Sequence, residues 1–278
     1  MALEDSIPVP DRLGLQTVGN GVEMVASPSA TTEQFCASYH LANHVFACAT
    51  RHGVVMLDLH RNKYFGLDMA DGASLAGVVR DWPAQRINGQ NAPIVSVDRS
   101  KVNNLVQSLL DANVLQSCPP SDYGISRSTF SLKGDLASVG DEIVAETPAR
   151  LGHVVSFLFS LLSASFSLRF LPLGFTVGVV HKRKARAIAK GYCFDAHRAA
   201  QFTFVFRRLR PYLFSANGHC IIHALALVNF MAIYGEFPSW VLGVRTEPWS
   251  AHSWVQHENF LFDTNPAKVC PYDPLLSV

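Results

Sequence analysis

The chain of 278 residues is 49% hydrophobic and only 16% charged, a composition that excludes an intrinsically disordered protein. Its length predicts two domains rather than one. The net charge of +1 hides an asymmetry, because residues 1–150 hold 11 Lys and Arg against 16 Asp and Glu while residues 151–278 hold 12 against 6, and neither half is basic enough to indicate nucleic-acid binding.

The start of the chain lacks the features of a secretory signal, since Glu4, Asp5 and Asp11 stand where basic and apolar residues would be needed. Residues 1–37 are rich in Pro, Ser, Thr and Gly and are predicted to form a poorly ordered extension. The six cysteines are spread singly without a Cys-x-x-Cys pair. They predict neither a disulfide framework nor a metal site, and a cytoplasmic protein is expected.

Residues 38–118 have the pattern of a small mixed module. Three short β-rich runs cover residues 44–50, 53–59 and 63–68 and predict a meander, with Val55, Leu57 and Leu59 on one face. Helices are expected at residues 71–80 and from Asp98 to residue 110, followed by a returning strand at 113–117. This order predicts a winged-helix-like fold.

A linker is predicted at residues 119–150, which are full of Ser, Gly and Pro. Residues 151–168 then carry no charged side chain and reach the lower limit of transmembrane length. We expect a helical hairpin in a soluble domain rather than a membrane span, with membrane association as the less favoured alternative. The basic run at residues 181–190 predicts a solvated helix face or a patch for an acidic partner.

The second domain, residues 151–278, is predicted to contain two further helices. Asp195 is a suitable N-cap for one that ends before Pro211, and the other runs from Cys220 to about Tyr234. Strands are expected near residues 239–245, 251–256 and 260–263.

Cys220 is the first candidate for chemistry. A thiol at a helix start experiences the positive end of the helix dipole and nearby N–H donors, which favour a reactive thiolate. His219 and His223 are ambiguous partners, because His219 points elsewhere and His223 lies one turn along the helix.

A better partner is expected in the run AHSWVQHENFLFD. If its hairpin is centred between His257 and Glu258, His252 lies opposite Asp263 and the carboxylate can orient the imidazole. A helix start bearing Cys220 packed against this hairpin would have the arrangement of papain-like and transglutaminase-like cysteine enzymes.

The stretch GVRTEPWSAHSWVQ, with the cysteine-headed helix upstream and the aspartate downstream, closely resembles the transglutaminase-like leader peptidases of lasso-peptide biosynthesis, the B proteins. The stretch YHLANHVFACATRHGVVMLDLHRNKYFGLD resembles their peptide-recognition element, a winged-helix module related to the pyrroloquinoline-quinone biosynthesis chaperone. Together the two regions cover residues 39–278. The resemblance implies an α+β protein whose catalytic triad is Cys220, His252 and Asp263.

The same resemblance implies that the protein binds the leader of a ribosomal precursor peptide and cuts it from the core. The leader would lie as an extra strand along residues 63–67, where Tyr64, Phe65 and Leu67 are candidate contacts, although alternation lets only one face touch the peptide. An asparagine-synthetase-like cyclase, which uses ATP, would be the partner. No cofactor is expected for this chain itself.

Two alternatives stay open. The same fold and triad could serve a transglutaminase-like acyl transferase or an amidase, which differ from the peptidase in the acyl acceptor. The chain could also be a non-catalytic scaffold that presents the leader to the cyclase, with Cys220 merely buried.

Overall fold

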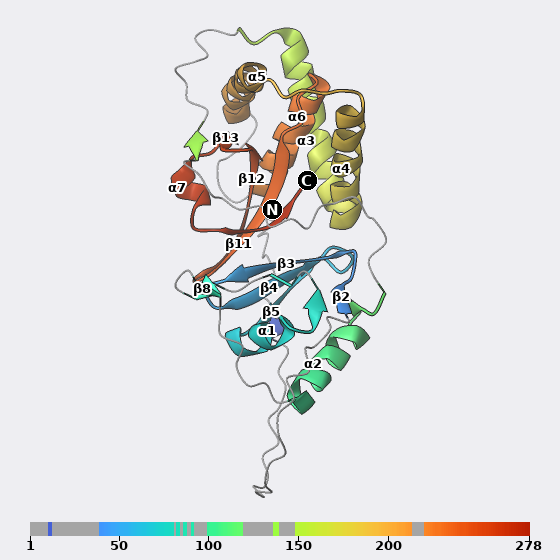
Figure 1. Cartoon of the computed structure of the whole chain (residues 1–278). Helices are drawn as coiled ribbons and strands as arrows, with labels where there is room; N and C mark the ends of the chain where they lie inside the picture. The colour runs from blue at the N-terminus through green and yellow to red at the C-terminus, as the bar shows by residue number, and fades with distance from the viewer. Residues whose placement is uncertain are drawn as a thin grey trace, which may run out of the picture.

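The computed structural model describes residues 11–12, 39–80, 82–83, 86–87, 90–91, 99–118, 136–138, 148–212 and 220–278. Helices and strands are mixed, and they form two stacked parts (Figure 1). The N-terminal part, blue to green, combines small sheets with two helices. The C-terminal part, yellow-green to red, surrounds a larger sheet with helices.

The predicted meander is present in the N-terminal part. Its antiparallel strands are β3 (Val45–Thr50), β4 (Gly53–Asp58) and β5 (Lys63–Leu67). The turn between β4 and β5 is fixed by the buried Asp58, whose Oδ1 accepts hydrogen bonds from the His60 and Arg61 N–H groups at 2.8 and 3.0 Å. This turn sets where β5 begins.

A fourth strand, β1 (Asp11–Arg12), pairs in parallel with the outer edge of β5, opposite Phe65 and Gly66. The N-terminal extension therefore contributes to the sheet at this point. The rest of residues 1–37 lies outside the described residues.

Both faces of the meander are buried. Val55, Leu57 and Leu59 share one face, as predicted, and join the core of the C-terminal part. Val54 and Met56 point the other way, into a separate core formed with the two N-terminal helices. The sheet is thus a layer between two cores.

The helices of the N-terminal part are α1 (Met69–Leu75) and α2 (Arg99–Asp111). The prediction for α1 was wrong at both ends. Asp68 caps the helix by accepting a hydrogen bond from the Asp71 N–H at 2.8 Å, and Val79–Arg80 form a strand, β6. The structure confirms α2, which buries its predicted apolar face against the meander core.

The remaining N-terminal strands are short. β2 (Tyr39–Leu41) lies between β6 and β9 (Leu115–Gln116), the predicted returning strand. β7 (Arg86–Ile87) pairs with β8 (Gln90–Asn91). The winged-helix assignment of this part stays a prediction.

Most of the predicted linker, 119–150, lies outside the described residues. β10 (Ala137–Ser138) is an exception, because it pairs in parallel with the edge of the C-terminal sheet. Residues 137–138 therefore belong to the sheet of the C-terminal part and are not linker.

The C-terminal part contains a helical layer. The predicted hairpin is formed by α3 (Leu151–Phe170) and α4 (Leu173–Ala189), and the two later helices are α5 (Ala196–Leu209) and α6 (Cys220–Ile233). A 3-10 turn, Arg210–Tyr212, follows α5.

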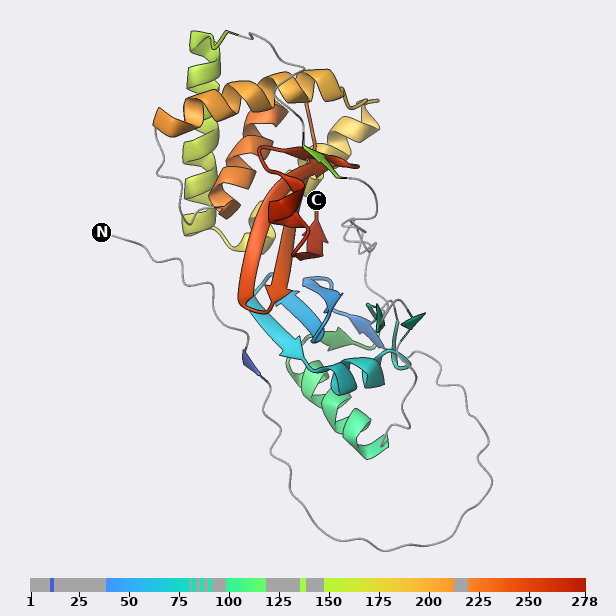
Figure 2. The same cartoon turned by 90° about the vertical axis from the view of Figure 1, so that its left-hand side faces the viewer.

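The C-terminal sheet has the order β10-β13-β12-β11-β14. Its other strands are β11 (Ser239–Thr246), β12 (Trp249–His257), β13 (Phe260–Phe262) and β14 (Asp273–Ser277), and a short helix α7 (Pro266–Val269) precedes β14. The β11–β12 hairpin extends toward the meander, and α6 covers one face of the sheet (Figure 2).

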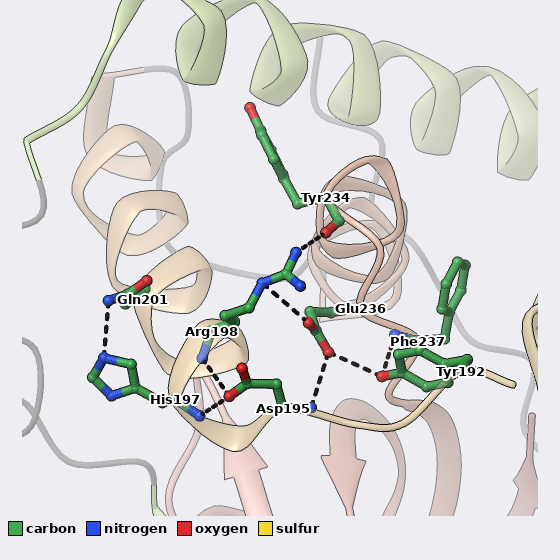
Figure 3. A network of polar contacts seen from close by, with 8 residues as sticks. All are labelled: Tyr192, Asp195, His197, Arg198, Gln201, Tyr234, Glu236 and Phe237. Carbon is green, nitrogen blue, oxygen red and sulfur yellow. Dashed lines mark hydrogen bonds and ion pairs between the residues drawn. The ribbon is translucent and has the colours of Figure 1, made fainter.

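A buried carboxylate fixes the far end of α6. Glu236 accepts hydrogen bonds from the Tyr192 hydroxyl at 3.0 Å and the Asp195 N–H at 3.3 Å, and lies 3.5 Å from Arg198 Nε (Figure 3). Arg198 also donates to the Tyr234 carbonyl at 2.7 Å. These contacts hold the end of α6 to the start of α5, which sets the direction in which α6 projects Cys220.

Candidate active site

Cys220 is the first residue of α6 and is half-buried. The following residues, from Ala224 to Met231, pack into the main core against α3, α5 and β12. The rest of the helix is therefore rigid, and its N-terminal end brings the thiol toward the N-terminal part. Unpaired N–H groups at a helix start favour a negative charge on a side chain or substrate placed there.

Tyr64 of β5 interacts electrostatically with this thiol. Alternation puts it on the face of the meander that meets the C-terminal part, because it pairs with Leu57. Burial raises the pKa of Tyr64 to about 12, and the negative charges that Cys220 and Cys48 carry when ionised add to the rise. The phenol therefore stays protonated and is a hydrogen-bond donor close enough to Cys220 to interact with it electrostatically.

Trp249, at the start of β12, completes this group. Its ring meets the edge of Tyr64 with centroids 5.5 Å apart. Its indole Nε1 is buried and has no hydrogen-bond partner among the described residues. A buried donor without a partner is costly, and a substrate carbonyl could satisfy it.

His252 lies on the opposite face of the sheet from α6. Ala251 and Val255 of β12 pack into the core that contains α6, whereas Trp254 packs into a separate cluster behind the sheet. His252 shares the face of Trp254, and its ring lies 5.1 Å from that of Tyr272. Burial lowers the pKa of His252, as does Lys268, so the ring is neutral at physiological pH.

The predicted pairing of His252 with Asp263 was wrong. The observed pairs are Val255 with Phe262 and His257 with Phe260, so the turn is Glu258–Asn259, one residue later than expected. Glu258 adopts a left-handed φ of 48° in this turn. Asn or Gly usually occupies such a position, so a glutamate gives no sign of this conformation in the sequence.

Asp263 instead bonds to arginines of the preceding helical segment. Its Oδ2 accepts a hydrogen bond from Arg210 Nη1 at 2.6 Å, and its Oδ1 lies 3.5 Å from Arg207 Nε. Burial raises the pKa of Asp263, although both arginines oppose the rise. Neither arginine was expected from the sequence to contact this carboxylate. The described conformation thus does not join Cys220, His252 and Asp263 in one hydrogen-bonded group.

The three predicted leader contacts separate in the structure. Tyr64 faces Cys220, Phe65 packs on the opposite face against the N-terminal core, and Leu67 is buried in that core. Side chains alternate between the two faces of β5, and this alternation could have indicated from the sequence that Leu67 lies in the core rather than at an exposed peptide contact.

The two parts also meet through polar side chains at the turn between β3 and β4. His52 Nε2 lies 3.3 Å from Glu247 Oε2 at the tip of the β11–β12 hairpin. Burial raises the pKa of Asp273, while Arg51 opposes the rise. Burial also raises the pKa of Cys48, with a further contribution from Asp273, so this thiol is protonated and unreactive.

Among the described residues, no group of three or more His, Cys, Asp and Glu side chains is placed to hold a metal ion.

Comparison with known proteins gives one family. Residues 160–277 match the model of the transglutaminase-like superfamily. Searches of curated proteins and of solved structures gave no match. The matched segment contains α6 with Cys220 at its start and the sheet that α6 covers, the helix-on-sheet arrangement expected from the sequence. Residues 160–277 therefore form a transglutaminase-like domain.

Proposed function

We propose that the protein is a leader peptidase of lasso-peptide maturation, a cysteine peptidase that binds the leader of a precursor peptide and hydrolyses the leader–core bond. The observation that carries this proposal is the position of Cys220, at the start of a rigid helix in a transglutaminase-like domain and facing Tyr64 of the N-terminal part. The freed core amine would then be joined to a side chain by an ATP-using, asparagine-synthetase-like cyclase.

The proposed reaction begins when the histidine imidazole takes the proton of the Cys220 thiol and the resulting thiolate attacks the last carbonyl of the leader. The C–N bond breaks, an imidazolium gives its proton to the departing core amine, and a thioester forms. Water, deprotonated by the same imidazole, then hydrolyses the thioester and releases the leader as an acid. The Tyr64 hydroxyl and the Trp249 Nε1–H are suited to donate to the oxyanion, together with the helix N–H groups.

Two histidines compete for the proton-transfer role. The motif PW-x-x-HSWV favours His252, with Asp263 as its orienting carboxylate, but both lie away from Cys220 in the described conformation. His223 lies one turn along α6, and residues three apart share a helix face. If His252 acts, β12 must present it differently when the peptide is bound. His252→Ala and His223→Ala separate the two, because only the catalytic change should lower kcat by about 10²-fold or more.

Leader binding is proposed along the outer edge of β5, which β1 covers at two residues, with main-chain hydrogen bonds supplying affinity. A peptide on this edge runs close to Tyr64, so its C-terminal end can continue toward Cys220. Recognition and cleavage would then use opposite ends of one extended peptide.

The test of the peptidase proposal is Cys220→Ala in the full chain, mixed with purified precursor peptide and followed by mass spectrometry. Leader release should disappear. Cys193→Ala is the matched control, because Cys193 is exposed and lies outside the site, and it should cleave normally. Undiminished cleavage by Cys220→Ala would overturn the proposal.

An acyl-transfer role is the second candidate, because the family match leaves the acyl acceptor open. Adding a primary amine to the reaction distinguishes it, since a transferase would leave the leader as an amide and a peptidase as an acid. Iodoacetamide at neutral pH tests the non-catalytic scaffold: Cys220 should react faster than the exposed Cys193 if it is a nucleophile and more slowly if it is structural.

A further inference from the structure

Helix α3 exposes an apolar face to the outside of the molecule. Phe157, Leu161 and Ala164 point inward, into the core shared with α6. Large apolar side chains spaced three or four residues apart cover the opposite side, and Phe159 and Leu162 keep 65% and 67% of their surface exposed. The exposed set on α3 comprises Leu151, Val155, Leu158, Phe159, Leu162, Phe166 and Phe170. Patches of this extent mark interaction sites.

Helix α4 follows α3 in the chain and also carries exposed apolar side chains, together with exposed basic ones. Phe175 and Val179 are exposed on its first half, and Lys182, Arg186 and Lys190 follow at the same helical spacing on its second half. Two residues separate the end of α3 from the start of α4, and the two helices contact each other. We call these exposed residues of α3 and α4, together with Arg169, the hairpin face.

The charged side chains of the α3–α4 hairpin, leaving aside histidine, are all positive. Residues 151–194 contain six Lys and Arg and no Asp or Glu, and the exposed basic residues are Arg169, Lys182, Arg186 and Lys190. Lys184 is partly buried and donates to Ser239 at 2.6 Å. Contact between two copies of the hairpin face would bring like charges together, whereas a surface that is apolar inside and anionic outside matches both of its properties.

The burial of one side of α3 favours a helix that lies on a membrane surface over one that crosses the membrane. Among the described residues, α3 is long and apolar enough to cross a membrane by length and composition, yet only 17% of its apolar window is buried inside the molecule. The buried part is the inner stripe against α6, and drawing α3 into a bilayer would remove it from the core. Its outer side alone is available to lipid.

We propose that the hairpin face docks the protein onto an anionic lipid bilayer, with α3 and α4 lying along the surface. Phe159, Phe166 and Phe175 enter the interface between headgroups and acyl chains, and Lys182 and Arg186 contact the anionic headgroups. Each Lys or Arg near such a surface strengthens binding by roughly fivefold. This docking is independent of the peptidase proposal and does not use Cys220.

The experiment is co-sedimentation of the full-length protein with vesicles of phosphatidylcholine alone or mixed with phosphatidylglycerol. We expect binding to the mixed vesicles, much weaker binding to phosphatidylcholine, and loss of binding at high salt. Phe159→Ser combined with Phe166→Ser should abolish binding, and Lys182→Glu combined with Arg186→Glu should weaken it at least tenfold. Ile188→Ser is the matched control, since Ile188 is exposed on α4 but turned away from the hairpin face.

Circular dichroism of each variant checks that the fold is retained, because these side chains are on the surface. Absence of wild-type binding, or equal binding to both vesicle types, would overturn the proposal. A wild-type dimer in light scattering that becomes monomeric in the Phe159→Ser, Phe166→Ser variant would assign the hairpin face to a second copy and also overturn it.

Discussion

Tyr64 and Cys220 come from opposite parts of the chain and meet where those parts are packed together. The phenol is partly buried, protonated and close enough to the thiol to interact with it electrostatically. A neutral donor in such a place can stabilise the thiolate or the oxyanion that forms during acyl transfer, and such donors act more strongly where water is excluded. We therefore assign the Tyr64 hydroxyl a stabilising role toward the thiolate or the oxyanion in the proposed reaction, in addition to the packing of its ring against Trp249.

Tyr64→Phe should lower kcat for leader cleavage by roughly tenfold or more, with a smaller change in KM, because it removes only the hydroxyl. Steady-state cleavage of the precursor measures this effect. Tyr39→Phe is the control, since Tyr39 is partly buried in the N-terminal core and away from Cys220. An unchanged kcat for Tyr64→Phe would limit this residue to packing.

Gly243 of β11 is required by the aromatic ring beside it. A Cβ at this position would lie 2.6 Å from the Trp254 ring and 3.1 Å from the Asp273 carbonyl oxygen. Gly243→Ala should therefore lower the free energy of unfolding by about 1–3 kcal/mol. Gly178→Ala in α4, where a Cβ meets nothing within 4 Å, should be neutral or stabilising. Urea denaturation compares the two variants, and equal stabilities would contradict the argument.

At the scale of the elements, β1 occupies the edge of β5 that the leader is proposed to use. The chain's own residues Asp11–Arg12 pair there in parallel with Phe65 and Gly66. A tethered segment has a high effective concentration at its own site, so even a short strand can compete with a peptide in solution.

Arg12→Pro should increase leader affinity several-fold, because proline lacks the N–H that a strand can donate to its neighbour. Fluorescence anisotropy of a labelled leader peptide with the full-length variant measures the dissociation constant. Arg12→Ala keeps the backbone N–H and should bind the leader like the wild type. If both variants bind alike, β1 does not compete for this edge.

Hydrophobic spacing predicted most of the longer elements, including the meander, α2, α5, α6 and the strands β11 and β12. The sequence did not predict β14, because Pro274 argues against a strand except at an edge, where β14 lies. The register of β12 with β13 was missed because it depends on a left-handed glutamate, Glu258. The turn was predicted one residue too early, and for this reason His252 was wrongly placed opposite Asp263.

At the scale of the whole molecule, stability should fall as the pH is lowered from about 7.5 to 5.5. Burial lowers the pKa of both His252 and His257 in the folded protein, with Lys268 and Lys184 contributing. Both rings take up a proton more readily in the unfolded chain, so the stabilisation is present above the unfolded pKa and is lost below it. Thermal unfolding at the two pH values tests this, and His257→Gln should reduce the loss.

The meander contributes one face to each of two cores, and this affects how the molecule loses its structure. Residues 39–118 taken alone would expose Phe46, Val55 and Leu57 to water, so they should not behave as a detachable binding domain. The two parts should instead unfold together, in a single calorimetric transition whose van't Hoff and calorimetric enthalpies agree. Two resolved transitions would contradict this. Cooperative unfolding would mean that damage to the meander also disorders the surroundings of Cys220, so a chain whose N-terminal part has unfolded would lose the proposed active site as well.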